Sequence, residues 1–537
     1  MSTTKILDCT LRDGGFVNDW NFGLDTIRDI IYRLDCAGVD FIELGYLNQN
    51  RPDDPDRTIL PSTASFARLS DRLRLRQARL VALTDYGTCD LDQIQPKSET
   101  ALDGLRVAFR KPALDQALEY CAQLMAKGYL VFLQPVSATS YSEAELVDLV
   151  RRVNELKPYS MALVDSYGLM FKKDVLRFFT IIDKHLDKEV NIGYHAHNNF
   201  QMACASCMDL LSLRGNRNII LDSSIFGMGR GAGNALTEVL AAYLNAEYGQ
   251  RYDLNQLAEI IDLHLARFYH NHPWGYCLPY YLSAANGCHH AYADYLLDRS
   301  TLSADSISQI IQAIDPEERL CFNRDLAEKL YLEHINVDIA DTAAREELKK
   351  LIAGRPILLL ATGSSLEEHG PRVEKFIRDQ NPIVLAVNFI PRKYAADYVF
   401  FSNGKRYSQF TDVYFGLDCP RPQILATSNL MEAAIPVDLV FNRAQLAWSQ
   451  NPKENNSLVL LGNLLGQLGV DEIYLAGFDG YDPGKPAYYY DDFLNNRKSS
   501  LAEADINQAV RDWLGAVKNM KVNFITPSIY DDLSRPE

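Results

Sequence analysis

The chain has 537 residues, of which 47% are hydrophobic and 23% charged, and these values favour a globular protein of two or three domains over a disordered one. Its net charge of −16 argues against a general nucleic-acid binder, which needs basic surface, although a local basic pocket for a small anion remains compatible with it. There is no apolar run of the roughly 20 residues that a membrane span requires, no signal peptide and no CxxC pair among the ten cysteines, so we expect a cytoplasmic protein without a disulfide framework or zinc knuckle.

Residues 1–250 alternate apolar, strand-like runs with amphipathic, helix-like runs. The eight strand candidates are KILDCT, DFIELGY, RLVALTD, GLRVAF, YLVFLQPV, MALVDS, VNIGYHAH and IILDSSIF. A helical pattern follows most of them and is less clear after the second and third. Such alternation predicts parallel strands joined by crossovers. Eight units in about 250 residues have the size of a TIM (β/α)₈ barrel, which we favour over an open doubly wound sheet.

Residues 251–353 have the pattern of a helical appendage, rich in Tyr and Trp over residues 268–297. We favour a cap that packs its aromatic side chains over a lid that faces a substrate or partner.

A second α/β pattern occupies residues 354–537. Its strand candidates are PILLLAT, PIVLAVNF, DYVFFSN, PQILAT, EIYLAGFD and VNFIT. With helical runs between these strands, the pattern predicts a second, Rossmann-like domain.

Polar segments fall at the ends of four predicted barrel strands, where a TIM barrel carries its catalytic groups. They are residues 8–15, Glu43, residues 194–199 and residues 227–234. His195 and His197 share one face because side chains alternate along a strand. Two imidazoles with the Asp13 carboxylate suit a divalent metal better than they suit a chance pair of structural histidines. Arg12 beside them would stabilise an enolate oxygen as its charge develops.

Together these segments resemble the DRE-TIM metallolyases, which include HMG-CoA lyase, 4-hydroxy-2-oxovalerate aldolase, and the isopropylmalate and homocitrate synthases. The resemblance rests on D-x-T-L-R-D-G at Asp8–Gly14, on H-x-H in GYHAHNN and on the glycine-rich turn that ends at Asn234. It implies Mn²⁺ or Mg²⁺ held by Asp13, His195 and His197, with Asn234 as a candidate fourth ligand, and Arg12 polarising the bound oxo or acyl group.

The resemblance also implies a reaction. A carbon–carbon bond is formed or cleaved through a metal-bound enolate of a 2-oxo acid such as pyruvate, with an aldehyde as the second substrate. The HAHNN context and the absence of an evident CoA signature favour the aldolase branch. Two alternatives remain open, which are a Claisen-type synthase that uses an acyl-CoA and a non-catalytic, metal-stabilised scaffold.

One departure concerns the proton carrier. The aldolase branch has a His shortly after L-R-D-G, whereas residues 15–20 here contain none. A general base must lie within hydrogen-bond reach of its proton, so another group has to serve. The candidates are Asp19, Glu43, Tyr46, Tyr141, His270 and His272. Asp19 is the simplest choice, and it is equally explained as the cap of the helix that follows.

Other polar residues near predicted strand ends have weaker claims. Gln134, Asp165 and Ser166 suit substrate or metal-supporting contacts as well as ordinary loop contacts. For Arg106 and Arg110 we favour solvated side chains over binding of a substrate carboxylate.

In the second domain, Gly363 and Ser364 lie between a strand and a helix. Amide groups at a helix start favour an anion such as phosphate, and a serine cap explains the same sequence. With Asn388, Asn403 and Asp479, this turn is similar to the Rossmann-like domains of bacterial family 42 sialyltransferases and related polysaccharide-biosynthesis proteins, over residues 354–530.

Those transferases use a His late in the domain, whereas the last His of this chain is His369. The departure disfavours a sialyltransferase activity and leaves nucleotide or nucleotide-sugar binding as the hypothesis. A sugar derivative in surface-polysaccharide synthesis is the substrate that this second domain suggests. By analogy, we expect a homodimer or pairing with a dehydrogenase.

Overall fold

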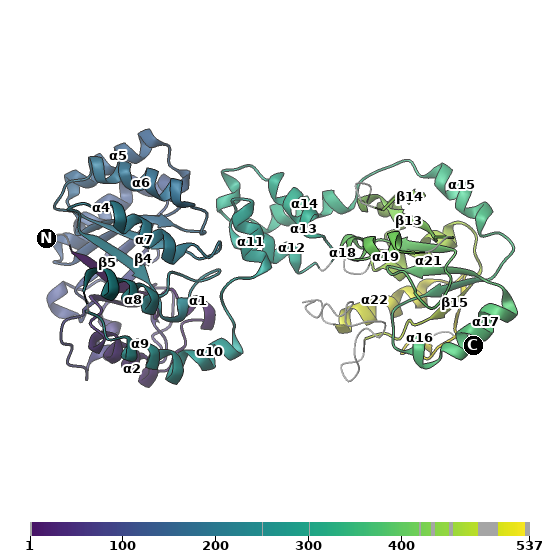
Figure 1. The fold of residues 1–537 in the computed structure, drawn as a ribbon, viewed down its shortest axis with the longest axis horizontal. Coiled ribbons are helices and arrows are strands. Elements are labelled where there is room, and N and C mark those ends of the chain that lie inside the picture. The colour runs from purple at the N-terminus through teal and green to yellow at the C-terminus, as the bar shows by residue number, and fades with distance from the viewer. Residues whose placement is uncertain are drawn as a thin grey trace. The chain divides into compact units, whose positions relative to one another are not determined.

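The computed structural model describes residues 3–249, 251–299, 301–417, 420–430, 435–449, 455–481 and 503–531. The chain divides into two compact units (Figure 1), one of residues 1–290 with 319–321 and the other of residues 291–318 with 322–537. Segment 251–353 is largely helical, as expected, and its residues are shared between the two units.

The first unit contains eight parallel strands that close into a barrel. They are β1 (Thr4–Asp8), β2 (Phe41–Leu47), β4 (Arg79–Asp85), β5 (Gly104–Phe109), β6 (Leu130–Pro135), β7 (Ser160–Asp165), β8 (Asn191–Ala196) and β9 (Ile219–Ser223). Hydrogen bonds run in the order β1-β9-β8-β7-β6-β5-β4-β2, and β1 pairs with β2 to close the ring. A two-residue strand, β3 (Ile59–Leu60), pairs with β2. The predicted TIM barrel is confirmed.

Amphipathic helices follow most of the barrel strands. The longer ones are α2 (Leu24–Cys36), α4 (Leu114–Ala126), α5 (Glu143–Leu156), α6 (Lys172–His185), α7 (Ala203–Leu213) and α8 (Thr237–Tyr248). In α2, Ile27, Ile30, Ile31 and Leu34 are buried, and their spacing of three to four residues makes one apolar stripe. After β2 and β4, where the helical pattern is unclear, the structure has α3 (Ala67–Ser70) and single 3₁₀ turns.

Short helices complete the first unit: α1 (Gly15–Asn18), α9 (Leu254–Ile260), α10 (Ala266–Asn271) and α11 (Leu278–Ala285). Inside the barrel, an apolar layer includes Leu7, Phe41, Phe132 and Ile220, all nearly or fully buried. The polar strand ends therefore rest on a floor from which water is excluded. Among the described residues, no helix has the length and apolar character needed to cross a membrane.

The second unit contains a sheet of seven parallel strands. They are β10 (Ile357–Leu360), β11 (Ile383–Val387), β12 (Tyr398–Phe401), β13 (Gln423–Thr427), β14 (Leu439–Phe441), β15 (Glu472–Ala476) and β16 (Lys521–Phe524), in the order β14-β13-β12-β11-β10-β15-β16. Six of them match the sequence analysis, which missed only the three-residue strand β14. The expectation of a second α/β domain is confirmed.

Helices of the second unit belong to two groups. Before the sheet come α12 (His290–Leu297), α13 (Ala304–Gln312), α14 (Arg324–Ile335) and α15 (Thr342–Leu351), the first of which begins on the last residue of the first unit. Between and after the strands are α16 (Ser365–Glu368), α17 (Gly370–Gln380), α18 (Gly404–Gln409), α19 (Thr411–Phe415), α20 (Arg443–Leu446), α21 (Ser457–Gln467) and α22 (Glu503–Ala516). Two apolar clusters, one holding Leu359 and Leu385 and the other Leu358 and Val384, form the core.

Candidate metal and active site

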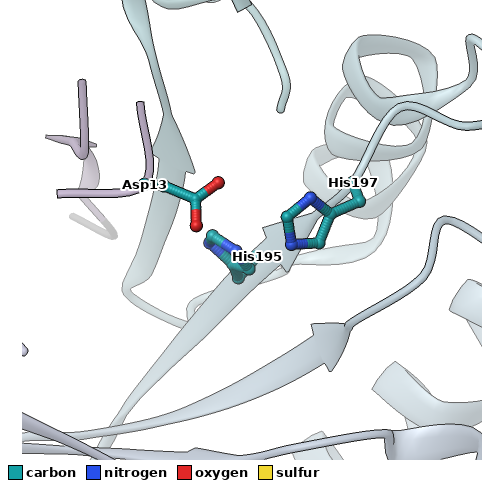
Figure 2. Close-up of side chains that lie close together, drawn as sticks. All are labelled: Asp13, His195 and His197. Carbon is teal, nitrogen blue, oxygen red and sulfur yellow. The ribbon is translucent and has the colours of Figure 1, made fainter. Parts of the chain in front are cut away.

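Asp13, His195 and His197 lie together at the carboxyl ends of the barrel strands. Asp13 follows β1, His195 lies on β8 and His197 comes directly after that strand. Figure 2 shows the carboxylate facing the two imidazoles, and one ligand atom from each residue lies within 4.8 Å of the others. All three side chains are buried. A carboxylate and two imidazoles in this arrangement form a donor set that suits a divalent cation.

Each imidazole is oriented by an oxygen at its Nδ1 atom. Nδ1 of His195 lies 3.0 Å from Oδ2 of Asp222, and Nδ1 of His197 lies 3.1 Å from the carbonyl oxygen of Arg230. These oxygens are acceptors, so each Nδ1 carries the hydrogen and each Nε2 presents a lone pair. Burial lowers the pKa of His197 to about 4. Both rings therefore have the tautomer that a metal ligand needs.

Asn234 has an amide oxygen in need of a partner. Its Nδ2 donates to Oδ2 of Asp13 at 2.6 Å, while its buried Oδ1 has no hydrogen-bond partner among the described residues. A buried acceptor left unpaired costs about 1–3 kcal/mol, and a cation beside Asp13 would satisfy it. Gly229 leaves the space, since a Cβ there would overlap the Asn234 amide and lie 2.6 Å from Asp13 Oδ2. The residues present fit a bound divalent ion.

Arg12 lies between two buried carboxylates. It pairs with Asp13, and its Nε donates to Oε2 of Glu43 at 2.7 Å. Burial alone would raise the pKa of Asp13, but the charge of Arg12, followed by those of the two imidazoles, holds it well below its usual range. The indole of Trp20 donates to the carbonyl oxygen of Arg12 at 2.7 Å. The guanidinium is thus fixed beside an ionised carboxylate.

Two buried residues extend this charge network across the barrel. Arg106 on β5 pairs with Glu43, at 2.9 Å between Nη1 and Oε1, and with Asp222 on β9. The expectation of a solvated Arg106 was wrong, because its side chain is fully buried. Asp222 was missed, although a single acidic residue in the apolar run IILDSS was a usable signal. A chain of oppositely charged side chains therefore connects Asp13 to His195, and it consists of Arg12, Glu43, Arg106 and Asp222.

Comparisons with known proteins find matches to the first part of this chain. Residues 3–263 match the HMGL-like family. An oxaloacetate decarboxylase of Mycobacterium tuberculosis is 27% identical over 246 residues, which are 44% of this chain and 69% of the relative. A 4-hydroxy-2-oxovalerate aldolase of Comamonas testosteroni is 26% identical over 243 residues, which are 44% of this chain and 66% of the relative. The N-terminal domain of a Bacteroides vulgatus protein is a solved structure with 26% identity and a TM-score of 0.48, covering 57% of this chain and 99% of that domain.

The carboxylates expected as general bases are already engaged. Asp19 is the C-cap residue of α1 and pairs with Arg57 and Arg51. Although slight burial opposes it, the hydrogen bond from Arg57 lowers the pKa of Asp19, and both arginines already occupy this carboxylate. Glu43 has one oxygen on Arg12 and the other on Arg106. The expectation that Asp19 caps the helix that follows was wrong, because the N-cap residue of α2 is Gly23 and Asp19 instead ends α1.

The remaining candidate bases differ in their surroundings. Tyr46 donates its hydroxyl to Oδ2 of Asp85 at 2.6 Å. Tyr141 is buried, and its hydroxyl has no partner among the described residues. Burial raises the pKa of Tyr141 to about 12, so the phenol stays protonated. His270 and His272 are exposed at the end of α10.

Polar residues at other strand ends serve local structure. Asp165 accepts hydrogen bonds from the backbone of Leu169 and Met170, at 2.8 and 3.0 Å, and Ser166 accepts one from Ser137. Arg110 donates to the carbonyl oxygen of Leu320 at 3.4 Å. Gln134 is buried on β6. The loop interpretation therefore accounts for the contacts of Asp165 and Ser166.

The predicted anion position of the second unit is filled by the chain itself. The carboxylate of Asp479 accepts the backbone N–H of Ser365 at 2.8 Å and the hydroxyl of Ser364 at 3.2 Å. Gly363 is needed here because a Cβ would overlap the Asp479 carboxylate. Since Asp479 supplies the negative charge at this helix start, an external phosphate would have to displace it.

Asn388 and Asn403 also have partners within the second unit. Asn388, at φ 56°, accepts the backbone N–H of Ser402 at 3.0 Å and donates to Ser457. Asn403 caps α18 by accepting the N–H of Arg406 at 3.1 Å. Both follow strands of the parallel sheet and stabilise the turns at its carboxyl edge.

Proposed function

We propose that the barrel is a divalent-metal-dependent carbon–carbon lyase of the aldolase type that acts on a 2-oxo acid. The convergence of Asp13, His195 and His197 beside the Arg12 guanidinium carries the proposal. The HMGL-like match and relatives named as an aldolase and a decarboxylase support it.

The residues suggest a division of roles. Asp13, His195 and His197, with the free amide oxygen of Asn234, would hold Mn²⁺ or Mg²⁺. The ion would supply Lewis-acid polarisation of a 2-oxo group. Arg12, held rigidly by carboxylates, stabilises negative charge as it develops on that oxygen, because a preorganised cation costs no reorganisation during the reaction. The apolar floor of the barrel keeps this interaction strong by excluding water.

The reactions in the names of the two relatives have a common intermediate. Loss of CO₂ from oxaloacetate and retro-aldol cleavage of 4-hydroxy-2-oxovalerate both leave the enolate of pyruvate. Formation of this enolate is therefore the most general readout for the barrel. It requires no knowledge of the aldehyde that this chain uses.

The test combines metal analysis of the purified protein with pyruvate C3 deuterium exchange followed by NMR. We expect exchange with Mn²⁺ or Mg²⁺ and its loss in Arg12→Ala and His195→Ala, with far-UV circular dichroism unchanged. His185→Ala, at an exposed imidazole on α6, is the matched control. Retained exchange in both site variants would refute the proposal. Metal binding without exchange would favour a scaffold, and thiol release from an acyl-CoA would favour a Claisen-type synthase.

For the second unit we propose nucleotide or nucleotide-sugar binding, in surface-polysaccharide or sugar metabolism. The strand order reverses between β10 and β15, and open parallel sheets bind ligands at the carboxyl ends of strands at such a point. Gly363, Asn388, Asn403 and Asp479 follow β10, β11, β12 and β15 at this edge. Calorimetric titration with nucleoside mono- and diphosphates tests the proposal, and the absence of any binding heat or thermal shift would contradict it.

A further inference from the structure

Two consecutive imidazoles, His289 and His290, follow α11, and the first of them contacts loops at the carboxyl face of the barrel. The ring of His289 lies 5.5 Å from that of Tyr167, in the loop after β7, and its Nε2 pairs with the side chain of Arg230, in the loop after β9. His290 stacks on His289 with ring centroids 4.5 Å apart. His289 is thus held against two loops that also border the metal ligands, and His290 packs on it.

Arg230 connects the imidazole pair to the candidate metal site. Its backbone N–H donates to Oδ2 of Asp13 at 3.3 Å, and its carbonyl oxygen accepts from Nδ1 of His197 at 3.1 Å. Its guanidinium lies 5.5 Å from the ring centroid of Phe16, in the segment that lacks a histidine. Arg230 therefore contacts both the candidate metal ligands and His289.

The two imidazoles are not equivalent. A guanidinium only donates, so Nε2 of His289 is an acceptor already in use. His290 is only partly buried, and none of the described residues forms a hydrogen bond with its ring nitrogens. Burial, then the charges of His289, Arg230 and His197, lower the pKa of His290 to about 2, so its ring is neutral at pH 7. His290 thus offers an open acceptor.

An anionic substrate would make this acceptor a better base. The positive charge of Arg230 is one of the causes that depress the pKa of His290. A carboxylate bound near Arg230 would offset that charge and raise the pKa of His290. Every 2-oxo acid carries such a carboxylate.

We propose that His290 is the proton-transferring residue of the aldol reaction, an inference that rests on the proposed function. In the cleavage direction, the hydroxyl proton on C4 of a 4-hydroxy-2-oxo acid moves to His290. The C3–C4 bond breaks, C4 becomes an aldehyde carbonyl, and the bonding electron pair forms the enolate whose oxygen Arg12 stabilises. Uptake of one proton at C3 then gives the 2-oxo acid and leaves the proton count balanced.

The test compares two reactions with different proton requirements. Cleavage of 4-hydroxy-2-oxovalerate needs a base for the hydroxyl, whereas decarboxylation of oxaloacetate does not. For His290→Ala and His290→Asn, with Mn²⁺ bound, we expect cleavage to fall by a factor of about 10²–10⁴, with decarboxylation within about twofold of wild type. Imidazole added to His290→Ala should restore part of the cleavage. His185→Ala, at an exposed histidine on α6, is the control.

The other outcomes distinguish failure of the role of His290 from failure of the proposed function. Unchanged cleavage in both His290 variants would overturn the inference alone, and loss of cleavage in Tyr141→Phe would then assign the role to Tyr141. Equal loss of both reactions without imidazole rescue would show a structural role for His290 and also overturn it. A metal-loaded wild-type protein inactive in both reactions and in pyruvate exchange would overturn the proposed function itself.

Discussion

Nδ1 of His195 lies 3.0 Å from Oδ2 of Asp222, a carboxylate that also pairs with the buried Arg106. The charge of Arg106, ahead of the His195 hydrogen bond, lowers the pKa of Asp222 despite complete burial. Asp222 therefore accepts the His195 hydrogen and leaves the opposite ring nitrogen for a metal.

Asp222→Asn should weaken metal binding by a factor of about 10–100, since residues that orient a ligating imidazole contribute to affinity in that range. The amide keeps the size of the side chain and removes the charge. Mn²⁺ titration monitored by electron paramagnetic resonance measures the affinity. Asp148→Asn, at an exposed ion pair on α5, is the control and should bind as the wild type does. Equal affinity in both variants would contradict the role of Asp222.

Arg106→Met should destabilise the protein by about 3–5 kcal/mol, because it leaves Glu43 and Asp222 as buried charges without their shared cation. Urea unfolding measures the free energy. Arg151→Met provides the comparison, since the Arg151 side chain is 62% exposed and pairs with Asp148 and Glu155. Its loss should cost less than about 1 kcal/mol. Similar costs for the two variants would contradict a structural role for the buried network.

Two glycines of α21 should respond oppositely to alanine. A Cβ at Gly462 would overlap the indole of the fully buried Trp513, whereas one at Gly466 meets open space. Gly462→Ala should therefore lower the free energy of unfolding by about 1–3 kcal/mol. Gly466→Ala should raise it by about 0.5–1 kcal/mol, because alanine favours a helix more than glycine does. Thermal unfolding compares the pair directly. If both substitutions change the stability in the same direction, the packing of α21 on α22 differs from that described.

Asp8 should give the protein a pH-dependent stability. Burial raises the pKa of this carboxyl from 3.8 to about 6. The folded state thus favours the protonated form, and the stabilisation present below pH 4 is lost as the pH rises through about 6. The free energy of unfolding of Asp8→Asn, relative to wild type, should increase by up to about 3 kcal/mol between pH 4 and 6. If the difference in stability between Asp8→Asn and wild type does not change with pH, the raised pKa of Asp8 is contradicted.

Much of the fold was readable from the sequence because buried parallel strands are continuous apolar runs. The convergence of Asp13 with His195 and His197 was predictable as well, since the ends of parallel strands share one edge of the barrel. β14 escaped detection because three residues are too few to establish a pattern.

Long-range pairing of charges was not predictable. Arg106 and Asp222 are 116 positions apart, and Ser365 and Asp479 are 114 apart. Nothing local in the sequence indicates that such residues meet. Asp19 was a reasonable base by position alone, and only the fold brings Arg51 and Arg57 to it. Barrel closure and loop packing decide these contacts.

Arg230 holds Asp13 and His197 through its backbone and His289 through its side chain. Ion uptake and ordering of the imidazole pair must therefore be reciprocal, because two events that share one structural element alter each other's equilibrium by the same factor. If a bound ion steadies the loop after β9 and with it His289, any molecule that clamps His289 tightens the hold on the ion equally. A substitution that changes the affinity for the metal would then also change how well His289 and His290 are ordered for the substrate, so the two properties would evolve together.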